Sequence, residues 1–500
     1  MFFLLAQFSF CDGKKEKVYD MNKKIVYGSI GSILIYLGIL MIIPFAVAWY
    51  EERTLSLFII KTWLIPLVIT VSSGVILERA GVKGIIKRRE GFVIVALGWL
   101  AVALFGSLPY VFSATLGPTD AFFESMSGFT TTGSTVMLNL EHVDRSILLW
   151  RSFTQWIGGM GVILLFIAIL PTFGIAGSQL FDREFPGPLS ERIRPRVQMT
   201  ARMLWSIYLI LTGAEVLALF YAAKMPLYHS FCTAFCTMPT GGFSPLSNNI
   251  AGYANPIAEF IIVVFMFLAG MNFILHYSLI RKPRRILANK EFQVYCLFLL
   301  AAISIITADL YIHKFGSIQE ALRYGGFQAI SFMTTSGFTT SNFDTWSHLS
   351  KIILFSLMFI GACGGSTGGS IKVIRIYVLL KYFKQRIRKI LYPHAIFVMK
   401  TGEKPISDDI VQGIVAFFIS YILIFVVCSI AMTAIGLDMV SAASSVAATL
   451  GNVGPGFCLV SANYASVPIL GKYILSFCMW AGRLELFTVL VLLTPAFWKG

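Results

Sequence analysis

Long apolar runs, separated by short polar connections, follow one another along the chain. A helix that crosses the hydrocarbon core of a bilayer needs about 20 apolar residues. Ten runs approach or exceed this length, at residues 25–49, 55–77, 91–112, 148–171, 201–222, 256–280, 292–313, 350–380, 410–434 and 470–497. The pattern therefore predicts an all-α polytopic membrane protein.

Four shorter apolar segments lie between these runs, all on one side of the predicted membrane. They are 118–136 (PTDAFFESMSGFTTTGSTV), 229–245, 321–340 and 436–457. Each is too apolar for an exposed loop and too short to span, and each contains Thr, Ser and Gly near its end. Irregular backbone at membrane depth is tolerated only where protein buries it or where it lines a wet cavity. We therefore expect four re-entrant segments around one cavity.

An alignment of these segments predicts an internal repeat. Gly133, Gly241, Gly337 and Gly451 can be superimposed, at separations of 108, 96 and 114 residues. The predicted fold is two N-terminal helices followed by four pseudo-symmetric helix–pore loop–helix repeats around one pore. The predicted units are a cytoplasmic tail (1–24), an N-terminal helix pair (25–90) and repeats at 91–197, 198–290, 291–404 and 405–500.

Composition agrees with a lipid-exposed surface. Apolar residues make up 57% of the chain and charged residues only 13%, whereas a soluble domain has about a quarter charged residues. The net charge of +15 does not indicate nucleic-acid binding, because no basic stripe alternates with stacking aromatics. The dispersed cysteines are read as small buried hydrophobes, since Cys232 and Cys236 have no nearby pair to complete a metal site.

The basic residues predict the orientation. Lys and Arg concentrate in alternate connections, at 1–24, 78–90, 172–202, 281–290 and 372–404. By the positive-inside rule both termini are then cytoplasmic, and the protein is a multi-pass protein of the cytoplasmic (inner) membrane. Residues 1–20 lack the basic start of a signal peptide. We read them as a disordered tail, or as upstream of a true start at Met21.

The glycine-rich ends of the four segments suit a cation filter. Rings of carbonyl oxygens replace the hydration shell of a cation in a narrow pore, and glycine allows the backbone dihedrals that turn successive carbonyls inward. Each short helix also directs its negative C-terminal end at the cavity. The candidate ion-binding residues are Thr131, Thr132, Gly133, Thr240, Gly241, Thr335, Ser336, Gly337, Thr449, Leu450, Gly451 and Asn452. The alternative is that these are ordinary helix C-caps.

These residues resemble the Trk/Ktr/HKT superfamily of potassium uptake proteins over nearly the whole chain. The two extra N-terminal helices, the run GACGGSTGGS (361–370) and the closing GRLELFTVLVLLTPAFW (482–498) are similar to its TrkH branch. The resemblance implies potassium uptake through the four filter glycines, with K⁺ as the transported ion and no cofactor in this chain. Pro239 and Leu450 depart from the Thr/Ser that precedes the glycine elsewhere, so potassium selectivity is less firmly indicated than cation conduction.

The run GACGGSTGGS interrupts the apolar stretch 350–380, and its glycine content breaks regular helix. A phosphate loop is excluded, because the Gly-Lys-Ser/Thr ending is missing; close packing of small residues between helices remains an alternative. The resemblance implies a gating loop beneath the filter, made of Gly361, Gly364, Gly365, Ser366, Thr367, Gly368 and Gly369.

Arg483 is predicted to be a basic residue well inside a span, where an unpaired charge costs several kcal/mol. Glu485 lies about 200° away around a helix, so the two should not share a face. The resemblance implies that Arg483 lines the pore near the gating loop; an ion pair between helices is the alternative.

Partners follow from the same resemblance. It implies a homodimer, with one pore in each chain, on a cytoplasmic TrkA-like ring of nucleotide-binding regulatory subunits. Basic loops at 281–285 and 381–389 could contact lipid headgroups or an acidic partner surface; no nucleic acid is expected.

Two other functions compete with simple cation conduction, a coupled symporter and a membrane-embedded enzyme. A symporter that couples K⁺ to H⁺ or Na⁺ is the closer alternative, although few titratable side chains lie inside the spans. A membrane-embedded enzyme is not indicated, because the sequence holds no HExxH motif and no paired intramembrane carboxylates.

Overall fold

The computed structural model describes residues 21–498 except 83, 85, 170–192, 282–283, 395–398 and 402–403. The predicted tail 1–20 therefore lies outside the described residues. Most of the described chain is helical, and its one pair of named strands is antiparallel, with two residues in each strand: β1 (Lys400–Thr401) and β2 (Lys404–Pro405). The predicted all-α class is confirmed.

Six of the ten predicted spans are apolar helices long enough to cross a membrane, as expected for a multi-pass membrane protein. They comprise α2–α3 (Lys23–Leu40 and Ile42–Glu52), α4–α5 (Leu57–Ile59 and Ile65–Ala80), α6–α7 (Arg88–Gly106 and Leu108–Phe112), α11 (Ile193–Tyr221), α16 (Lys290–His313) and α20 (Asp408–Ala434). A seventh predicted span corresponds to α9 (Arg145–Ile169).

The other three predicted spans are broken, although we expected a break in only one. The broken pairs are α13 (Pro256–Gly270) with α14 (Phe273–Arg281), α18 (His348–Leu357) with α19 (Val373–Leu391), and α22 (Ile469–Arg483) with α23 (Phe487–Leu492). Asn272 starts α14 by accepting a bond from the Ile274 amide at 2.9 Å. Glu485 and Leu486 end α22 with φ of 60° and 46°. These local contacts do not interrupt the apolar pattern, which explains why the pattern missed both breaks.

Four short helices occupy the predicted re-entrant segments. They are α8 (Pro118–Phe129), α12 (Leu227–Thr237), α17 (Ile318–Met333) and α21 (Met439–Leu450). After each comes an extended strand and then a 3₁₀ turn, at Leu140–His142, Asn249–Tyr253, Phe343–Thr345 and Cys458–Val460. The same order of elements thus occurs four times.

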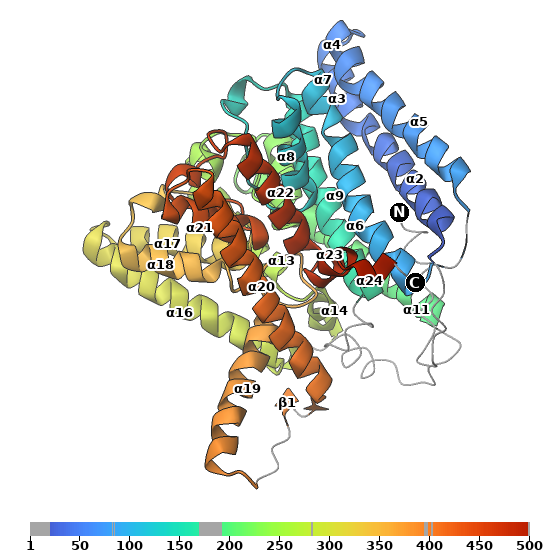
Figure 1. Ribbon diagram of the computed structural model, residues 1–500. Helices are drawn as coiled ribbons and strands as arrows, with labels where there is room; N and C mark the ends of the chain where they lie inside the picture. Colours follow the sequence, from blue (N-terminus) through green and yellow to red (C-terminus); the bar gives the residue numbers. More distant parts are fainter. Residues whose placement is uncertain are drawn as a thin grey trace.

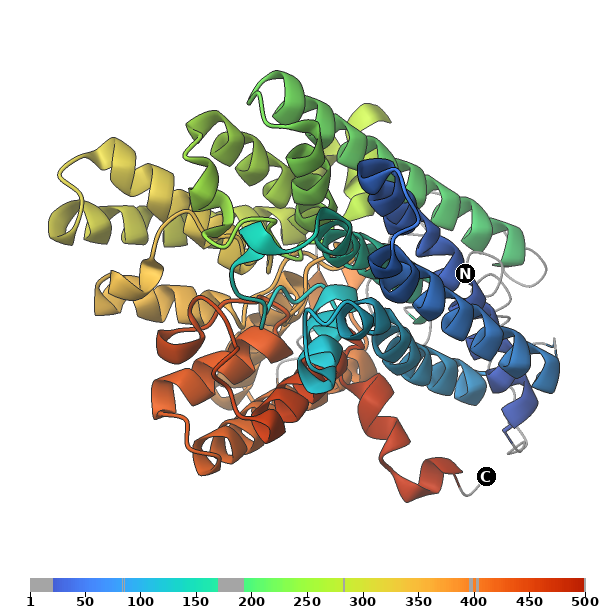
Figure 2. The same ribbon diagram turned by 90° about the horizontal axis from the view of Figure 1, so that it is seen from above.

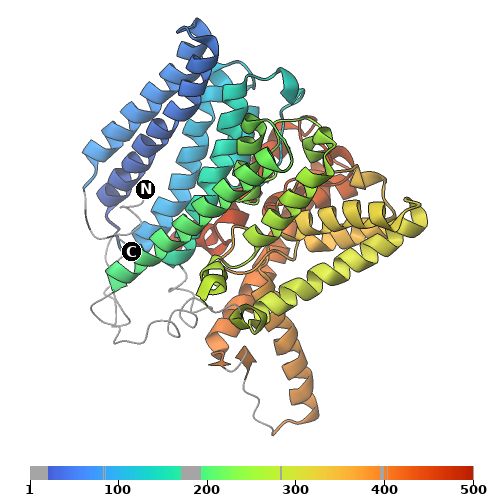
Figure 3. The ribbon, with the colours of Figure 1, turned by 180° about the vertical axis from the view of Figure 1, so that it is seen from behind.

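The successive units follow one another around a common centre, as the view from above shows (Figure 2). The N-terminal helices lie outside this arrangement, whereas α19 extends away from the other helices together with the N-terminal end of α20 (Figures 1 and 3). The remaining short helices are α15 (Arg284–Leu287) and α24 (Pro495–Trp498).

Close backbone contact holds the N-terminal pair α2 and α5 together. A Cβ on Gly31 would overlap the backbone of Gly74 and Glu78, and one on Gly81 would overlap that of Gly28. Small residues of this kind let membrane helices approach closely.

Candidate functional site

The four short helices end in the same backbone conformation. One or two residues after each helix cap, a non-glycine residue has a left-handed φ: Thr131 (51°), Thr240 (56°), Thr335 (60°) and Asn452 (53°). Two residues further on, a glycine has a positive φ: Gly133 (87°), Gly242 (79°), Gly337 (72°) and Gly454 (104°). Positive φ is strained for residues with a Cβ, so these glycines are required by the backbone.

The four glycines form a closed ring. A Cβ on Gly133 would overlap the carbonyl oxygen of Gly241, and one on Gly242 would overlap that of Ser336. A Cβ on Gly337 would overlap the Val453 oxygen, and one on Gly454 would lie 2.7 Å from the Thr132 oxygen. Each repeat thus places a carbonyl oxygen against the glycine of the preceding repeat, and the fourth glycine meets the first strand. The strands therefore surround a single axis.

This geometry corrects two of the four predicted glycine equivalences. Gly242 and Gly454, rather than Gly241 and Gly451, occupy the positions of Gly133 and Gly337. Gly241 lies one residue earlier in its strand, and Gly451, with φ of −78°, caps α21. The alignment matched the first glycine after each short helix, whereas the glycine with positive φ lies two residues after the left-handed Thr or Asn in all four repeats.

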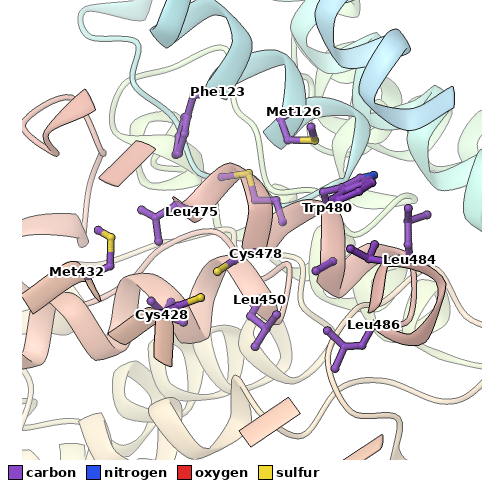
Figure 4. Packing of buried hydrophobic residues seen from close by; sticks show 14 of the residues in the cluster. Phe123, Met126, Cys428, Met432, Leu450, Leu475, Cys478, Trp480, Leu484 and Leu486 are labelled. Carbon is purple, nitrogen blue, oxygen red and sulfur yellow. The ribbon is translucent and has the colours of Figure 1, made fainter. Parts of the chain in front are cut away.

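Thr449 and Leu450 also lie outside the strand, within α21. The Thr449 hydroxyl donates to the Ser445 carbonyl at 2.7 Å. Leu450 packs with Cys428, Leu475 and Cys478 in the apolar core (Figure 4). Of the predicted fourth-repeat residues, Asn452 alone lies in the strand.

Side chains from neighbouring elements hold the strands in place. The Gln155 amide donates to the Gly241 carbonyl at 2.7 Å, and its oxygen accepts from the Phe243 amide at 3.2 Å. The Asn452 amide donates to the Thr132 hydroxyl at 2.9 Å, and the Ser134 hydroxyl donates to the Gly454 carbonyl at 3.0 Å. These bonds cross from repeat 1 to repeats 2 and 4, so they fix the diameter of the ring.

A buried ion pair lies behind the first two strands. Arg151 Nε is 2.6 Å from Glu124 Oε1, with side-chain exposures of 2% and 0%. The same guanidinium donates to the Ser244 carbonyl at 2.8 Å and lies 3.6 Å from the centre of the Phe243 ring. Glu124 also accepts from the Val136 amide at 2.8 Å. The pair thus joins α8 and α9 to two strands.

We expect Glu124→Gln to destabilise the protein. Removing one partner of a buried pair leaves the other charge uncompensated, at a cost of about 3–5 kcal/mol. Thermal unfolding of the detergent-solubilised protein, followed by the loss of the monodisperse chromatographic peak, measures the effect. The matched control is Glu51→Gln, because Glu51 pairs with the exposed Arg145, and exposed pairs contribute about 0–1 kcal/mol. Equal thermal stability of the two variants would contradict this role.

The glycine-rich run forms a loop between α18 and α19, directly against the helix-proximal side of the ring. The Thr367 hydroxyl donates to the Met238 carbonyl at 2.9 Å, and the Gly369 amide donates to the Thr335 hydroxyl at 2.7 Å. A Cβ on Gly369 would overlap the Gly451 carbonyl oxygen. The loop therefore contacts repeats 2, 3 and 4 where their short helices end.

The break between α13 and α14 in repeat 2, together with Glu291 at the start of α16, holds the first part of the loop. The Cys363 amide donates to the Gly270 carbonyl at 3.0 Å, and the Gly365 carbonyl accepts from the Phe273 amide at 3.0 Å. The Gly364 amide donates to Glu291 Oε1 at 2.6 Å. Gly365 has a φ of +73° and faces the Asn272 amide.

Two buried basic side chains approach the loop. Arg483 Nη1 donates to the Thr367 carbonyl at 2.8 Å, and Arg483 is 3% exposed. Its Nε and Nη2 have no hydrogen-bond partner among the described residues. Lys372, also 3% exposed, bonds to the Gly368 carbonyl. The expected position of Arg483 beside the loop agrees with this contact.

Glu485 does not pair with Arg483. Its carboxylate lies 2.5 Å from Arg375 Nη1 on α19. The two residues were expected to lie on different faces of one helix, but it is the end of α22 at Arg483 and the positive φ of Glu485 that separate them. The pair Arg375–Glu485 thus joins α19 to the break after α22. The positive charges of Arg483 and Lys372 remain on the loop side of the ring.

The sequence contained signals for some of the residues that were missed. Gly242-Phe243 and Gly337-Phe338 are identical dipeptides, and aligning them would have placed Gly242 correctly. Gln155 and Glu124 contact residues more than 20 positions away in the sequence, and Lys372 contacts a carbonyl that only the folded loop brings near. Spacing along the chain does not predict such contacts.

The sequence of the chain is similar to those of known proteins. The sequence profile of the TrkH family, described as cation transport protein, matches residues 65–499. The chain is 41% identical over 423 residues to the Trk system potassium uptake protein TrkH of Salmonella typhimurium, covering 83% of this chain and 87% of that protein. It is 38% identical over 485 residues to the protein of the same name from Escherichia coli, covering 96% and 100%.

A solved structure gives the same result. The crystal structure of the potassium transporter TrkH from Vibrio parahaemolyticus superposes with a TM-score of 0.88 at 34% identity, covering 96% of this chain and 100% of that one. Similarity of sequence and fold thus extends over nearly the full length of both chains. The chain therefore belongs to the TrkH family of cation transport proteins.

Proposed function

We propose that this chain takes up potassium across the cytoplasmic membrane through the ring of four strands. The observation that carries the proposal is the closed cycle in which each strand glycine faces a carbonyl oxygen of the next strand. Such a cycle can present carbonyl oxygens from all four sides to a dehydrated cation. The names of the relatives from Salmonella typhimurium and Escherichia coli support K⁺ as that cation.

The ion-binding residues are then revised from those expected from sequence. We propose Thr131, Thr132, Gly133, Thr240, Gly241, Gly242, Thr335, Ser336, Gly337, Asn452, Val453 and Gly454. Thr131 Oγ1 and Asn452 Oδ1 are buried oxygens without a hydrogen-bond partner in the described part of the chain. Both are on residues with left-handed φ, so both belong to the same layer of the ring. The Asn452 amide also donates to the Met479 carbonyl of α22 at 3.1 Å, and its Oδ1 lies beside Gly369 and Gly482, so this side chain faces the loop and α22, and we propose the backbone carbonyls as the ion ligands.

The loop 361–369 and Arg483 act as the gate in this proposal. The loop lies where an ion leaving the ring on the helix-proximal side would pass. Arg483 adds the fixed positive charge of its guanidinium at the same place. Movement of the loop away from Met238 and Thr335 would open the path, because it breaks the hydrogen bonds that Thr367 and Gly369 make with the ends of the short helices. Channel-like flux with a gate is thus the mechanism that we propose, and K⁺/H⁺ or K⁺/Na⁺ symport is the competing mechanism.

The assembly and orientation are proposals of the same kind. Both termini are placed in the cytoplasm, in a homodimer that sits on a TrkA-like nucleotide-binding ring and is surrounded by lipid. The basic helix α19, which extends from the other helices (Figure 1), suits contact with such a ring. Co-purification with the ring, lost on charge reversal of residues 381–389, tests this placement.

Growth of a bacterium that lacks its own potassium uptake systems tests the proposed function. Expression of this chain, together with a TrkA-type partner, should restore growth at limiting K⁺. Growth that is restored by added Na⁺ rather than K⁺, or that is not restored although the protein is present in the membrane, would overturn the proposal.

A further inference from the structure

An apolar cavity of about 390 Å³ lies between the N-terminal helix pair and the first two repeats. It is lined by α2, α6, α9 and α11 together with Phe129 at the end of α8. Three of the polar groups at its wall have hydrogen-bond partners of their own. Trp99 Nε1 donates to the Phe129 carbonyl at 3.3 Å, Trp156 Nε1 to the Thr212 hydroxyl at 3.2 Å, and the Ser29 hydroxyl to the Ile25 carbonyl at 2.9 Å.

The cavity faces the hydrocarbon region of the bilayer. Its lining residues on α2, from Ser29 to Leu40, and on α6, from Ile94 to Val102, come from the middle stretches of membrane-long helices. Tyr36 and Ile39 at its edge are 44% and 50% exposed. Its mouth is therefore continuous with the surface that meets lipid.

The size and chemistry of the cavity select its occupant. Water is disfavoured, because a buried water needs two to four polar partners, whereas an apolar cavity of about 150 Å³ stays dry and takes up benzene. A helix from a second copy, about 10 Å in diameter, is too wide to enter a cavity of 390 Å³. A single acyl chain is thin, apolar and present in the surrounding medium.

We propose that one acyl chain of a membrane phospholipid occupies this cavity and packs against Trp99 and Phe129. The chain would support the filter from behind, because Phe129 is two residues before Thr131. Gly158, which also lines the cavity, contacts the Phe129 carbonyl so closely that a Cβ there would overlap it. An occupant on this side completes the packing around the end of α8.

A phospholipid with a photoactivatable diazirine in the middle of its acyl chain tests the proposal. The full-length protein is reconstituted in phosphatidylethanolamine–phosphatidylglycerol vesicles with this lipid, irradiated, and digested for mass spectrometry. We expect label on the cavity-facing residues Gly98, Trp99 and Val102 above that on the outward-facing Leu104, which is 55% exposed.

A filling variant and a matched control sharpen the test. In Gly98→Leu the new side chain would enter the cavity, since the Ile33 side chain is the one neighbour found within 4 Å of a Cβ there. Gly213→Leu makes the same change at an exposed position of α11 where no described atom lies within 4 Å. We expect loss of the cavity label in Gly98→Leu and full label in Gly213→Leu.

Three results would overturn the proposal. They are wild-type label no higher at the cavity than at Leu104, cavity label unchanged in Gly98→Leu, and crosslinks that join the cavity wall to another polypeptide segment or a second copy. If Gly98→Leu does not fold, Val102→Trp fills the same space from the same helix. The wild-type label is decisive without either variant.

Discussion

Gly242→Ala should abolish potassium uptake. The sequence alone indicated the adjacent Gly241 as the filter glycine. Gly242 has a φ of +79°, and a Cβ there would overlap the Ser336 carbonyl oxygen. The strained backbone alone costs about 1–3 kcal/mol, and the overlap forces the strands of repeats 2 and 3 apart. Since about 1.4 kcal/mol in a barrier is tenfold in rate, we expect uptake to fall by more than tenfold in tracer flux into vesicles.

Two control variants separate the ring from general damage. Gly117→Ala lies just before α8 at a site with no described atom within 4 Å of a Cβ, and it should retain full uptake. Gly241→Ala meets the Gln155 side chain rather than a backbone oxygen, so its loss of uptake should be smaller than that of Gly242→Ala. A larger loss for Gly241→Ala would return the filter to the position expected from sequence alone.

Arg483→Gln should raise the potassium flux while leaving folded protein in the membrane. The guanidinium donates to the Thr367 carbonyl, and Arg483 is 3% exposed. Its positive charge therefore repels a cation on the loop side of the ring, and solvent screens this repulsion only weakly. At an effective dielectric constant of about 20, a unit charge at about 8 Å contributes about 2 kcal/mol. Where this barrier limits the flux, removing the charge should raise the flux by roughly thirtyfold.

Arg145→Gln is the matched control for this change. Arg145 pairs with Glu51 and its side chain is 65% exposed, so the same substitution there should leave the flux unaltered. Flux in Arg483→Gln equal to that of the wild type would remove Arg483 from the gate. Absence of folded protein would instead show that Arg483 has a structural role.

The apolar pattern predicted most of the architecture because lipid imposes it. A span must be apolar over about 20 residues, and seven of the ten predicted runs correspond to helices such as α16 and α20. The re-entrant helices were visible for the same reason, since α8 and α21 are apolar but too short to cross. The breaks after Gly270 and Arg483 were missed, because Asn272 and Glu485 change the backbone without making the run polar.

The site was predicted less completely than the fold. The predicted equivalence of Gly133 and Gly337 agrees with their shared positive φ. Gly242 and Gly454 were not aligned with them, because the alignment used the first glycine after each short helix, whereas the glycine with positive φ lies two residues after Thr240 and Asn452. The contact of Gly369 with Thr335 and that of Gln155 with Gly241 join residues 34 and 86 positions apart, and a single sequence does not reveal such pairs.

The reversal potential of this chain in planar bilayers or proteoliposomes tests the central claim most directly. With K⁺ and Na⁺ gradients set in opposite directions, a carbonyl ring that conducts K⁺ predicts a reversal potential near the K⁺ equilibrium value. This value should not move when the pH on one side is changed, and Gly454→Ser should shift it toward the Na⁺ equilibrium value. A reversal potential that follows the proton or Na⁺ gradient in the wild type, or one that Gly454→Ser leaves unchanged, would contradict the account.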